Sequence, residues 1–264
     1  MFRLEERLEQ YGYEMAVSDA RQHERVYQYT TFEALEKIIC NRSLRLTRMD
    51  LLNDTLENEK IHDLWKNKVY VSCFTNRGYE SYFFWKTYAR GSSDGVRISF
   101  KTDCLLDLSV APDKKCENKL LKYEKENIVD NISNIVSKRD WEIFDYSVLD
   151  IKYLQRDADI SESKEFLGRY KYREWDMEQE TRIRVAIRPR GLEFETKGLD
   201  DFEYIKPEEK HLYLGLSDDV LKSMQLTLSP FADCDLRKEV ENLLKDNMLD
   251  DIRVEKSLLT DEVK

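Results

Sequence analysis

The chain has 264 residues, of which 41% are hydrophobic and 11% aromatic, and this composition is enough for a packed core and excludes wholesale disorder. Its formal net charge is −10, a sign that disfavours broad binding of nucleic acid, although 43 Lys and Arg leave room for a local basic groove. No apolar run approaches the ~20 residues of a membrane span, and acidic residues at the N-terminus argue against a signal peptide.

Cysteine and histidine are sparse and scattered. The five cysteines are odd in number and no two have the CxxC spacing, which disfavours a disulfide framework or a zinc knuckle. Because there are only three histidines, we expect no metal site, and the cysteine usage indicates a reducing, cytoplasmic setting.

The N-terminal part of the chain predicts an arm, a strand and a helix in that order. Residues 1–25 are typical of a charged helix or a loosely held arm, and residues 26–29 of a short strand. Thr30 and Glu33 have the spacing of a capping box, which predicts a helix with Thr30 as its N-cap.

Short strands and helices follow without a regular βαβ alternation. Strands are predicted from β-branched, aromatic or alternating sequence at residues 43–47, 68–76, 96–100, 146–154, 180–187 and 211–217. Helices are predicted at residues 82–89, 114–138, 160–167 and 235–248, and the tail after residue 252 is predicted to be frayed. This mixture indicates an α+β fold and not a doubly wound parallel sheet.

The chain shows no obvious domain linker. It contains only 8 Gly and 4 Pro, and no internal repeat is visible. We expect an arm at residues 1–25, one α+β catalytic-like domain with mixed antiparallel sheets and helical insertions at residues 26–230, and an amphipathic helix with a tail at residues 231–264.

The stretch KYREWDMEQETRIRV, residues 171–185, combines high charge density with strand-like alternation. In a strand, Glu180, Arg182 and Arg184 share one face while the apolar residues between them face the core. Glu178 joins the polar face if the strand begins early. Two interpretations stay open: a solvated edge strand with a salt-bridge ladder, which the pattern alone favours, or the acidic wall of an active site.

Other polar positions also have two interpretations. Tyr29 lies in a strand with Gln28 facing the opposite side, as either a core-covering edge strand or a ligand-facing one. Ser72 could bind a ligand with its hydroxyl or simply lie near the end of a strand. No G-x-G-x-x-G, P-loop or G-x-S-x-G motif is present, and the glycine-rich loop at residues 91–95 is typical of a hairpin turn.

Five segments in order resemble DUF2971, a bacterial family of unknown function, over roughly residues 26–216. They are YQYTT at residues 27–31, NDTLE at 53–57, SCFT at 72–75, WKTYA with GVRISF at 85–100, and WDMEQETR at 175–182. Gln28 stands where the family usually has histidine, and Thr55 where it has proline. The resemblance marks Asn53, Asp54 and Glu57 as a further motif.

The same layout is more distantly similar to the ADP-ribosyltransferase fold, which implies a split β core and NAD as a substrate. By that resemblance Glu180 is the catalytic glutamate, and Glu178 orients or deprotonates the acceptor. Tyr29 and Trp85 are implied to stack on the rings of NAD, and Arg97 or Arg182 to neutralise its pyrophosphate. The implied NAD-binding residues are Gln28, Tyr29, Thr30, Ser72, Trp85, Tyr88, Arg97 and Arg182.

The leading hypothesis is an NAD-dependent ADP-ribosyltransferase, a toxin-like effector in bacterial conflict or phage defence. Its acceptor would be a protein or a nucleic acid, and an antitoxin or another protein would be its partner. One alternative is a non-catalytic protein-interaction module that uses the helix near Leu236 and Leu244. Another is a nuclease with Asp54, Glu57 and Glu180 around Mg²⁺.

Overall fold

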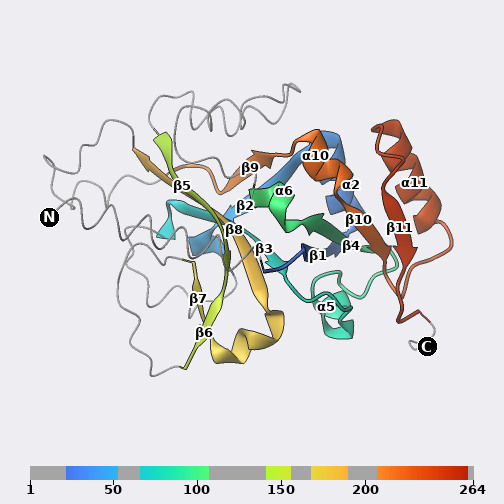
Figure 1. Ribbon diagram of the computed structural model, residues 1–264, viewed down its shortest axis with the longest axis horizontal. Coiled ribbons are helices and arrows are strands. Elements are labelled where there is room, and N and C mark those ends of the chain that lie inside the picture. The colour runs from blue at the N-terminus through green and yellow to red at the C-terminus, as the bar shows by residue number, and fades with distance from the viewer. Residues whose placement is uncertain (1–21, 53–65, 107–140, 156–167, 190–206, 261–264) are drawn as a thin grey trace, which may run out of the picture. The chain divides into compact units, whose positions relative to one another are not determined.

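The computed structural model describes residues 22–52, 66–106, 141–155, 168–189 and 207–260 (Figure 1). Most of the predicted N-terminal arm lies outside the described residues. The same holds for the predicted helices at residues 114–138 and 160–167 and for the motif residues Asn53, Asp54 and Glu57.

The predicted α+β class is confirmed, since the chain combines helices with mixed, mostly antiparallel sheet structure. The described residues fall into two compact units that are interleaved in the sequence. The first unit takes in Gln22 and the described parts of Arg45–Cys73 and Ser109–Leu214. The second takes in those of His23–Leu44, Phe74–Leu108 and Gly215–Lys264. The domain boundaries predicted from the sequence stay a prediction.

The second unit is built on antiparallel strands with a parallel pair at one edge. Strand β1 (Arg25–Thr31) pairs along its whole length with β4 (Gly95–Lys101), which pairs on its other side with β10 (Gln225–Leu228). Strand β11 (Arg253–Lys256) then runs parallel to β10. The side chains of β4 are buried on both faces except at Lys101, so this strand crosses the core of the unit.

The helix after β1 starts one residue later than predicted. Helix α2 (Phe32–Asn41) has Thr31 as its N-cap, without a side-chain capping bond. Thr30 remains in β1, where it pairs with Val96, and the predicted capping box is therefore wrong. The strand runs directly into the helix, which leaves no free residue at Thr30 to serve as a cap.

The remaining helices of the second unit are short except for the last. They are α5 (Tyr82–Thr87), α6 (Thr102–Leu106), α10 (Asp218–Lys222) and α11 (Leu236–Asp246). Helix α11 confirms the predicted C-terminal amphipathic helix, with Leu236, Val240, Leu243 and Leu244 buried. No helix among the described residues is both long and apolar enough to cross a membrane.

The segment after residue 252 is ordered into a strand, so the predicted frayed tail is wrong. All four residues of β11 pair with β10, from Arg253 opposite Gln225 to Lys256 opposite Leu228. The chain then returns to the carboxylate of Glu80, which accepts hydrogen bonds from the backbone of Leu258 and the side chain of Ser257. Main-chain pairing orders this charged segment, and the pattern of its side chains gave no indication of that pairing.

The longer strands of the first unit are β2 (Ser43–Arg48), β3 (Val69–Thr75), β9 (His211–Gly215), β5 (Trp141–Asp150) and β8 (Glu180–Pro189). Strands β2, β3 and β9 each have one or two end residues that belong to the second unit. Strand β8 pairs with both β3 and β5. A short parallel pair, β6 (Lys152–Leu154) and β7 (Tyr170–Tyr172), and the 3-10 turns η1 (Met49–Leu51) and η3 (Arg173–Glu178) complete it.

Candidate active site

The charged stretch of residues 171–185 folds as three pieces and not as one strand. Strand β7 leads into η3, and Gln179 then adopts the left-handed conformation, with φ of 40°, before β8 starts at Glu180. Glu178 therefore lies outside the strand, and the early strand start that would have put it on the polar face does not occur. The left-handed turn at Gln179 interrupts the strand, so the alternation of side chains does not extend from Glu180 back to Glu178.

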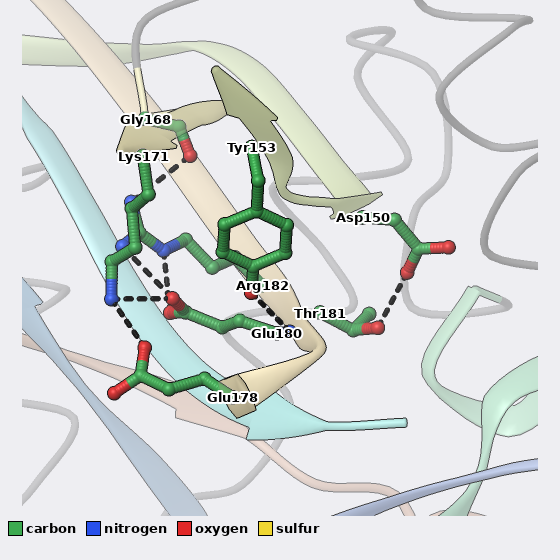
Figure 2. A network of polar contacts seen from close by, with 8 residues as sticks. All are labelled: Asp150, Tyr153, Gly168, Lys171, Glu178, Glu180, Thr181 and Arg182. Carbon is green, nitrogen blue, oxygen red and sulfur yellow. Dashed lines mark hydrogen bonds and ion pairs between the residues drawn. The ribbon is translucent and has the colours of Figure 1, made fainter. Parts of the chain in front are cut away.

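The two glutamates nevertheless meet at a single cation, Lys171, on β7 (Figure 2). The Nζ atom of Lys171 donates to Oε2 of Glu178 at 2.7 Å and lies 2.7 Å from Oε2 of Glu180. All three side chains are largely buried, and water screens such contacts poorly. Lys171 is thus the group that brings the Glu-x-Glu pair together.

Glu180 is also held by the guanidinium two residues further along the strand (Figure 2). Arg182 donates from Nε to Oε1 of Glu180 at 2.6 Å and from Nη2 to Oε2 at 3.2 Å, a fork that fixes both carboxylate oxygens. Its Nη1 donates to the carbonyl of Gly168 at 3.0 Å. Glu180 is only 4% exposed and Arg182 only 1%. The solvated-strand interpretation is therefore wrong, because this polar face is buried.

The ionisation of the cluster follows from these contacts. Burial alone raises the pKa of Glu180, but the charges of Arg182 and Lys171 outweigh it and lower the pKa to about 2. Burial lowers the pKa of Lys171, and the charge of Glu180 more than compensates, so the pKa lies above its ordinary value. Glu180 is thus fixed as an anion and Lys171 as a cation at neutral pH.

Two neighbouring residues complete the surroundings of Glu180. The hydroxyl oxygen of Tyr153 accepts from the backbone N–H of Glu180 at 2.8 Å, and Tyr153 pairs with Lys171 in the β6–β7 ladder. The thiol of Cys73 hydrogen-bonds the Glu180 carboxylate. Burial and the charge of Glu180 raise the pKa of that thiol, so Cys73 stays protonated and acts as a donor.

An exposed ring lies beside the buried carboxylates. Trp175, in η3, is 36% exposed, and the Nζ atom of Lys171 lies 5.3 Å from the centre of its ring. Met177, two residues on, is exposed as well. The turn that carries Glu178 therefore has an apolar surface next to a charged interior.

Most of the other predicted site residues lie in the second unit. Tyr29 and Trp85 pack edge to face with ring centres 4.8 Å apart, in a cluster that also contains Phe84 and Ala89. Trp85 has no exposed surface, and its indole donates to Glu80. The stacking role predicted for Trp85 is therefore wrong for this structure, in which the indole fills the core.

The predicted phosphate-binding Arg97 is engaged within the same unit. Its guanidinium lies 3.8 Å from the centre of the Tyr27 ring, and Nη2 donates to the carbonyls of Arg77 and Gly78. Its Nε has no hydrogen-bond partner among the residues that the structure describes. Its role toward a pyrophosphate stays a prediction.

The remaining predicted residues are divided between the units. Gln28 and Thr30 lie in β1, opposite Ile98 and Val96, and Tyr88 is exposed at the end of α5. Ser72 is buried in β3, in the first unit. The structure thus brings together Glu178, Glu180 and Arg182, which all belong to the first unit.

Four members of the cluster were missed by the sequence prediction, namely Lys171, Tyr153, Cys73 and Gly168. Lys171 sits between two tyrosines in a three-residue strand, too short for alternation to identify. Gly168 has φ of 80°, and its carbonyl accepts from Arg182. Among the described residues no group of His, Cys, Asp or Glu has the arrangement of a metal site, and the predicted ligands Asp54 and Glu57 lie outside them.

The fold and the cluster define an α+β protein with a buried, ion-paired carboxylate pair at the start of a strand. A family model described as a protein of unknown function, DUF2971, matches residues 84–183. The match covers the tryptophan-containing segment of α5, strand β4 and the start of β8, while YQYTT and SCFT lie outside it. The search of curated proteins and the search of solved structures each returned no match.

Proposed function

We propose that this protein is an NAD-dependent ADP-ribosyltransferase and that Glu180 is its catalytic carboxylate. The observation that carries the proposal is the convergence of Glu178 and Glu180 on the Nζ atom of Lys171, which keeps two carboxylates together at the start of β8. A carboxylate held as an anion suits a reaction whose transition state develops positive charge.

In the proposed reaction the bond between the ribose C1′ and the nicotinamide nitrogen breaks, and its electron pair leaves with neutral nicotinamide. The ribose passes through an oxocarbenium-like state, as a sugar does in glycoside cleavage, and the negative charge of Glu180 stabilises it. The acceptor then forms a bond to C1′ and gives its proton to Glu178. The products are nicotinamide and the ADP-ribosylated acceptor.

The surroundings of the pair support these separate roles. Arg182 binds both oxygens of Glu180, which favours a fixed orientation and the anionic form. Glu178 lies on a turn and contacts Lys171, the cation that it shares with Glu180. Trp175 offers an exposed ring on which a planar ligand group can stack.

The proposed setting is the bacterial cytoplasm, where the protein would act as a toxin-like effector in conflict or phage defence. The acceptor would be a protein or a nucleic acid, and an antitoxin would restrain the activity. Among the described residues, Cys40, Cys73, Cys104 and Cys234 form no disulfide, which supports a reducing compartment.

A second candidate is a non-catalytic binding module in which the cluster only joins β7 to β8. The observation in its favour is that both oxygens of Glu180 are already bonded to cations within the protein. In this case Glu180→Gln would reduce stability and would have no reaction to abolish.

The test is to incubate the purified protein with NAD and to measure nicotinamide release by chromatography, for the wild type and for Glu180→Gln. Glu241→Gln is the matched control, since Glu241 is an exposed glutamate in an ion pair with Arg237 on α11. We expect nicotinamide release by the wild type and by Glu241→Gln. The rate of release by Glu180→Gln should be lower by a factor of about 100 or more.

Thermal unfolding of each variant separates lost chemistry from lost folding. A wild-type protein that neither binds nor consumes NAD contradicts the proposal and leaves the binding module as the better account. Equal rates for the wild type and folded Glu180→Gln contradict the role of Glu180.

A further inference from the structure

Helix α5 carries aromatic rings on both of its faces. Phe84 and Trp85 point inward and are buried, whereas Tyr82 and Phe83 are 48% and 44% exposed. Tyr79, just before the helix, is 63% exposed. A helix that only needs to cover a core has polar residues on its outer face, so burial does not explain these three rings.

Cationic side chains are interleaved with the exposed rings. Lys86 follows Tyr82 by four residues and Phe83 by three, and its Nζ lies 4.1 Å from the centre of the Phe231 ring, against which Tyr82 packs edge-on. Its Nζ lies 5.5 Å from the centre of the Tyr82 ring. The guanidinium of Arg77 lies 5.3 Å from the centre of the Tyr79 ring.

The local charge differs in sign from that of the whole chain. Residues 76–94 contain three cations, Arg77, Lys86 and Arg90, and two acids, Glu80 and Asp94, whereas the chain as a whole has a net charge of −10. The Glu80 carboxylate is turned away from the rings' outer surface, because it accepts hydrogen bonds from Trp85, Ser257 and Leu258. Lys86 and Arg90 are both exposed.

We propose that Tyr79 and the outer face of α5 bind single-stranded nucleic acid. The bases stack on Tyr79, Tyr82 and Phe83, and the phosphates lie near Lys86, Arg77 and Arg90. Aromatic platforms among cations bind single strands with little sequence preference, because every base has a stacking face. A duplex keeps these faces inside its own stack, so the surface discriminates against it. This binding does not depend on the proposed reaction with NAD.

The test measures binding of a fluorescein-labelled oligothymidine of about 20 nucleotides, a length above the ~4–16 nucleotides of a typical single-strand site, by fluorescence anisotropy. We expect Phe83→Ala and Tyr79→Ala each to weaken binding by about 5- to 150-fold, the range for loss of one stacked base. Lys86→Gln should weaken binding and reduce the slope of log affinity against log salt by about 0.7.

Two control variants make the result specific. Met248→Ala removes an exposed apolar side chain elsewhere in the second unit and should bind as the wild type does. Phe83→Tyr keeps a ring at the same position and should retain the affinity that Phe83→Ala loses. Circular dichroism establishes that each variant is folded.

Several results would overturn the proposal. They are no binding of the oligonucleotide by the wild type, equal affinity for a duplex of the same length, or no effect of removing the rings. Sedimentation equilibrium tests whether a second copy of the chain occupies the surface instead. Self-association of the wild type through these rings, without binding of the oligonucleotide, would show that it does.

Discussion

The two units bury an arginine in different ways. In the first unit, Arg182 is neutralised by a carboxylate, that of Glu180, through two hydrogen bonds. In the second unit, Arg97 lies over the ring of Tyr27 and donates to two backbone carbonyls. The first arrangement sets full charges against each other, while the second uses the weaker partial charges of a ring and of peptide groups.

This difference separates a cluster held by full charges from one held by packing and partial charges. Under the proposed function the ionised carboxylate of Glu180 stabilises positive charge in the transition state, whereas the guanidinium of Arg97 packs against the ring of Tyr27. The two arrangements should also respond differently to substitution, because removing one partner of an ion pair leaves a buried charge unmatched.

The largest expected effect is that of Arg182→Met. The substitution leaves the Glu180 carboxylate with Lys171 as its remaining ion-pair partner in the cluster, and we expect the free energy of unfolding to fall by about 3 kcal/mol or more in urea denaturation. Lys37→Met is the control, since it breaks the exposed pair with Glu33 on α2 and should cost about 0.5 kcal/mol or less. A loss below about 1 kcal/mol for Arg182→Met would contradict the ion-pair account.

The second prediction concerns acid. Because the pKa of Glu180 falls from an ordinary 4.5 to about 2 in the folded protein, its ionisation stabilises the fold above pH 4.5. That contribution, about 3 kcal/mol at ~1.4 kcal/mol per pKa unit, is lost as the pH falls from 4.5 toward 2. Urea denaturation across this range should therefore show a steeper loss for the wild type than for Glu180→Gln.

Glu33→Gln is the control for the acid series. Lys37 lowers the pKa of Glu33 through a hydrogen bond and its charge, but Glu33 is exposed on α2, where water screens the pair. Its profile should follow that of the wild type. Parallel profiles for the wild type and Glu180→Gln would show that Glu180 does not carry the expected acid sensitivity.

A smaller effect is expected for Arg97→Met in the second unit. The variant loses the cation–π contact with Tyr27 and the hydrogen bonds to Arg77 and Gly78, but leaves no buried carboxylate behind. We expect a loss of about 1–2 kcal/mol by urea denaturation. A loss equal to that of Arg182→Met would remove the distinction between the two buried arginines.

The smallest predicted effect is that of Gly168→Ala. The backbone at Gly168 is left-handed, and an added Cβ would lie 3.1 Å from the sulfur of Met49, so we expect a loss of about 1 kcal/mol in thermal or urea unfolding. Gly78→Ala is the control, because an added Cβ there meets only the Tyr27 hydroxyl at an ordinary 3.8 Å. Unchanged stability of Gly168→Ala would show that this turn tolerates a side chain.

Much of the fold was predictable from local patterns. The apolar and β-branched residues of β3 and β4 and the apolar face of α11 located these elements correctly. Strand β11 was missed because its residues are mostly charged and its order comes from main-chain pairing with β10. The capping box at Thr30 failed because strand pairing, which is not local in sequence, extends to that residue.

The candidate site was predicted in part. Alternation correctly placed Glu180 and Arg182 on one strand face, but it gave no indication that this face is buried. The partners of Glu180 come from other segments: Lys171 from β7, Tyr153 from β6 and Cys73 from β3. Tertiary pairing decides such contacts, so the central role of Lys171 was not visible in the sequence.

The most direct test of the central claim separates NAD binding from NAD turnover. Isothermal titration gives the affinity for NAD and the rate of nicotinamide release gives the turnover, for the wild type and for folded Glu180→Gln. A residue that acts on the transition state should change kcat by about 100-fold or more and leave the affinity within a few-fold. Equal turnover in both proteins, or no binding of NAD by the wild type, would contradict the assignment of Glu180 as the catalytic carboxylate.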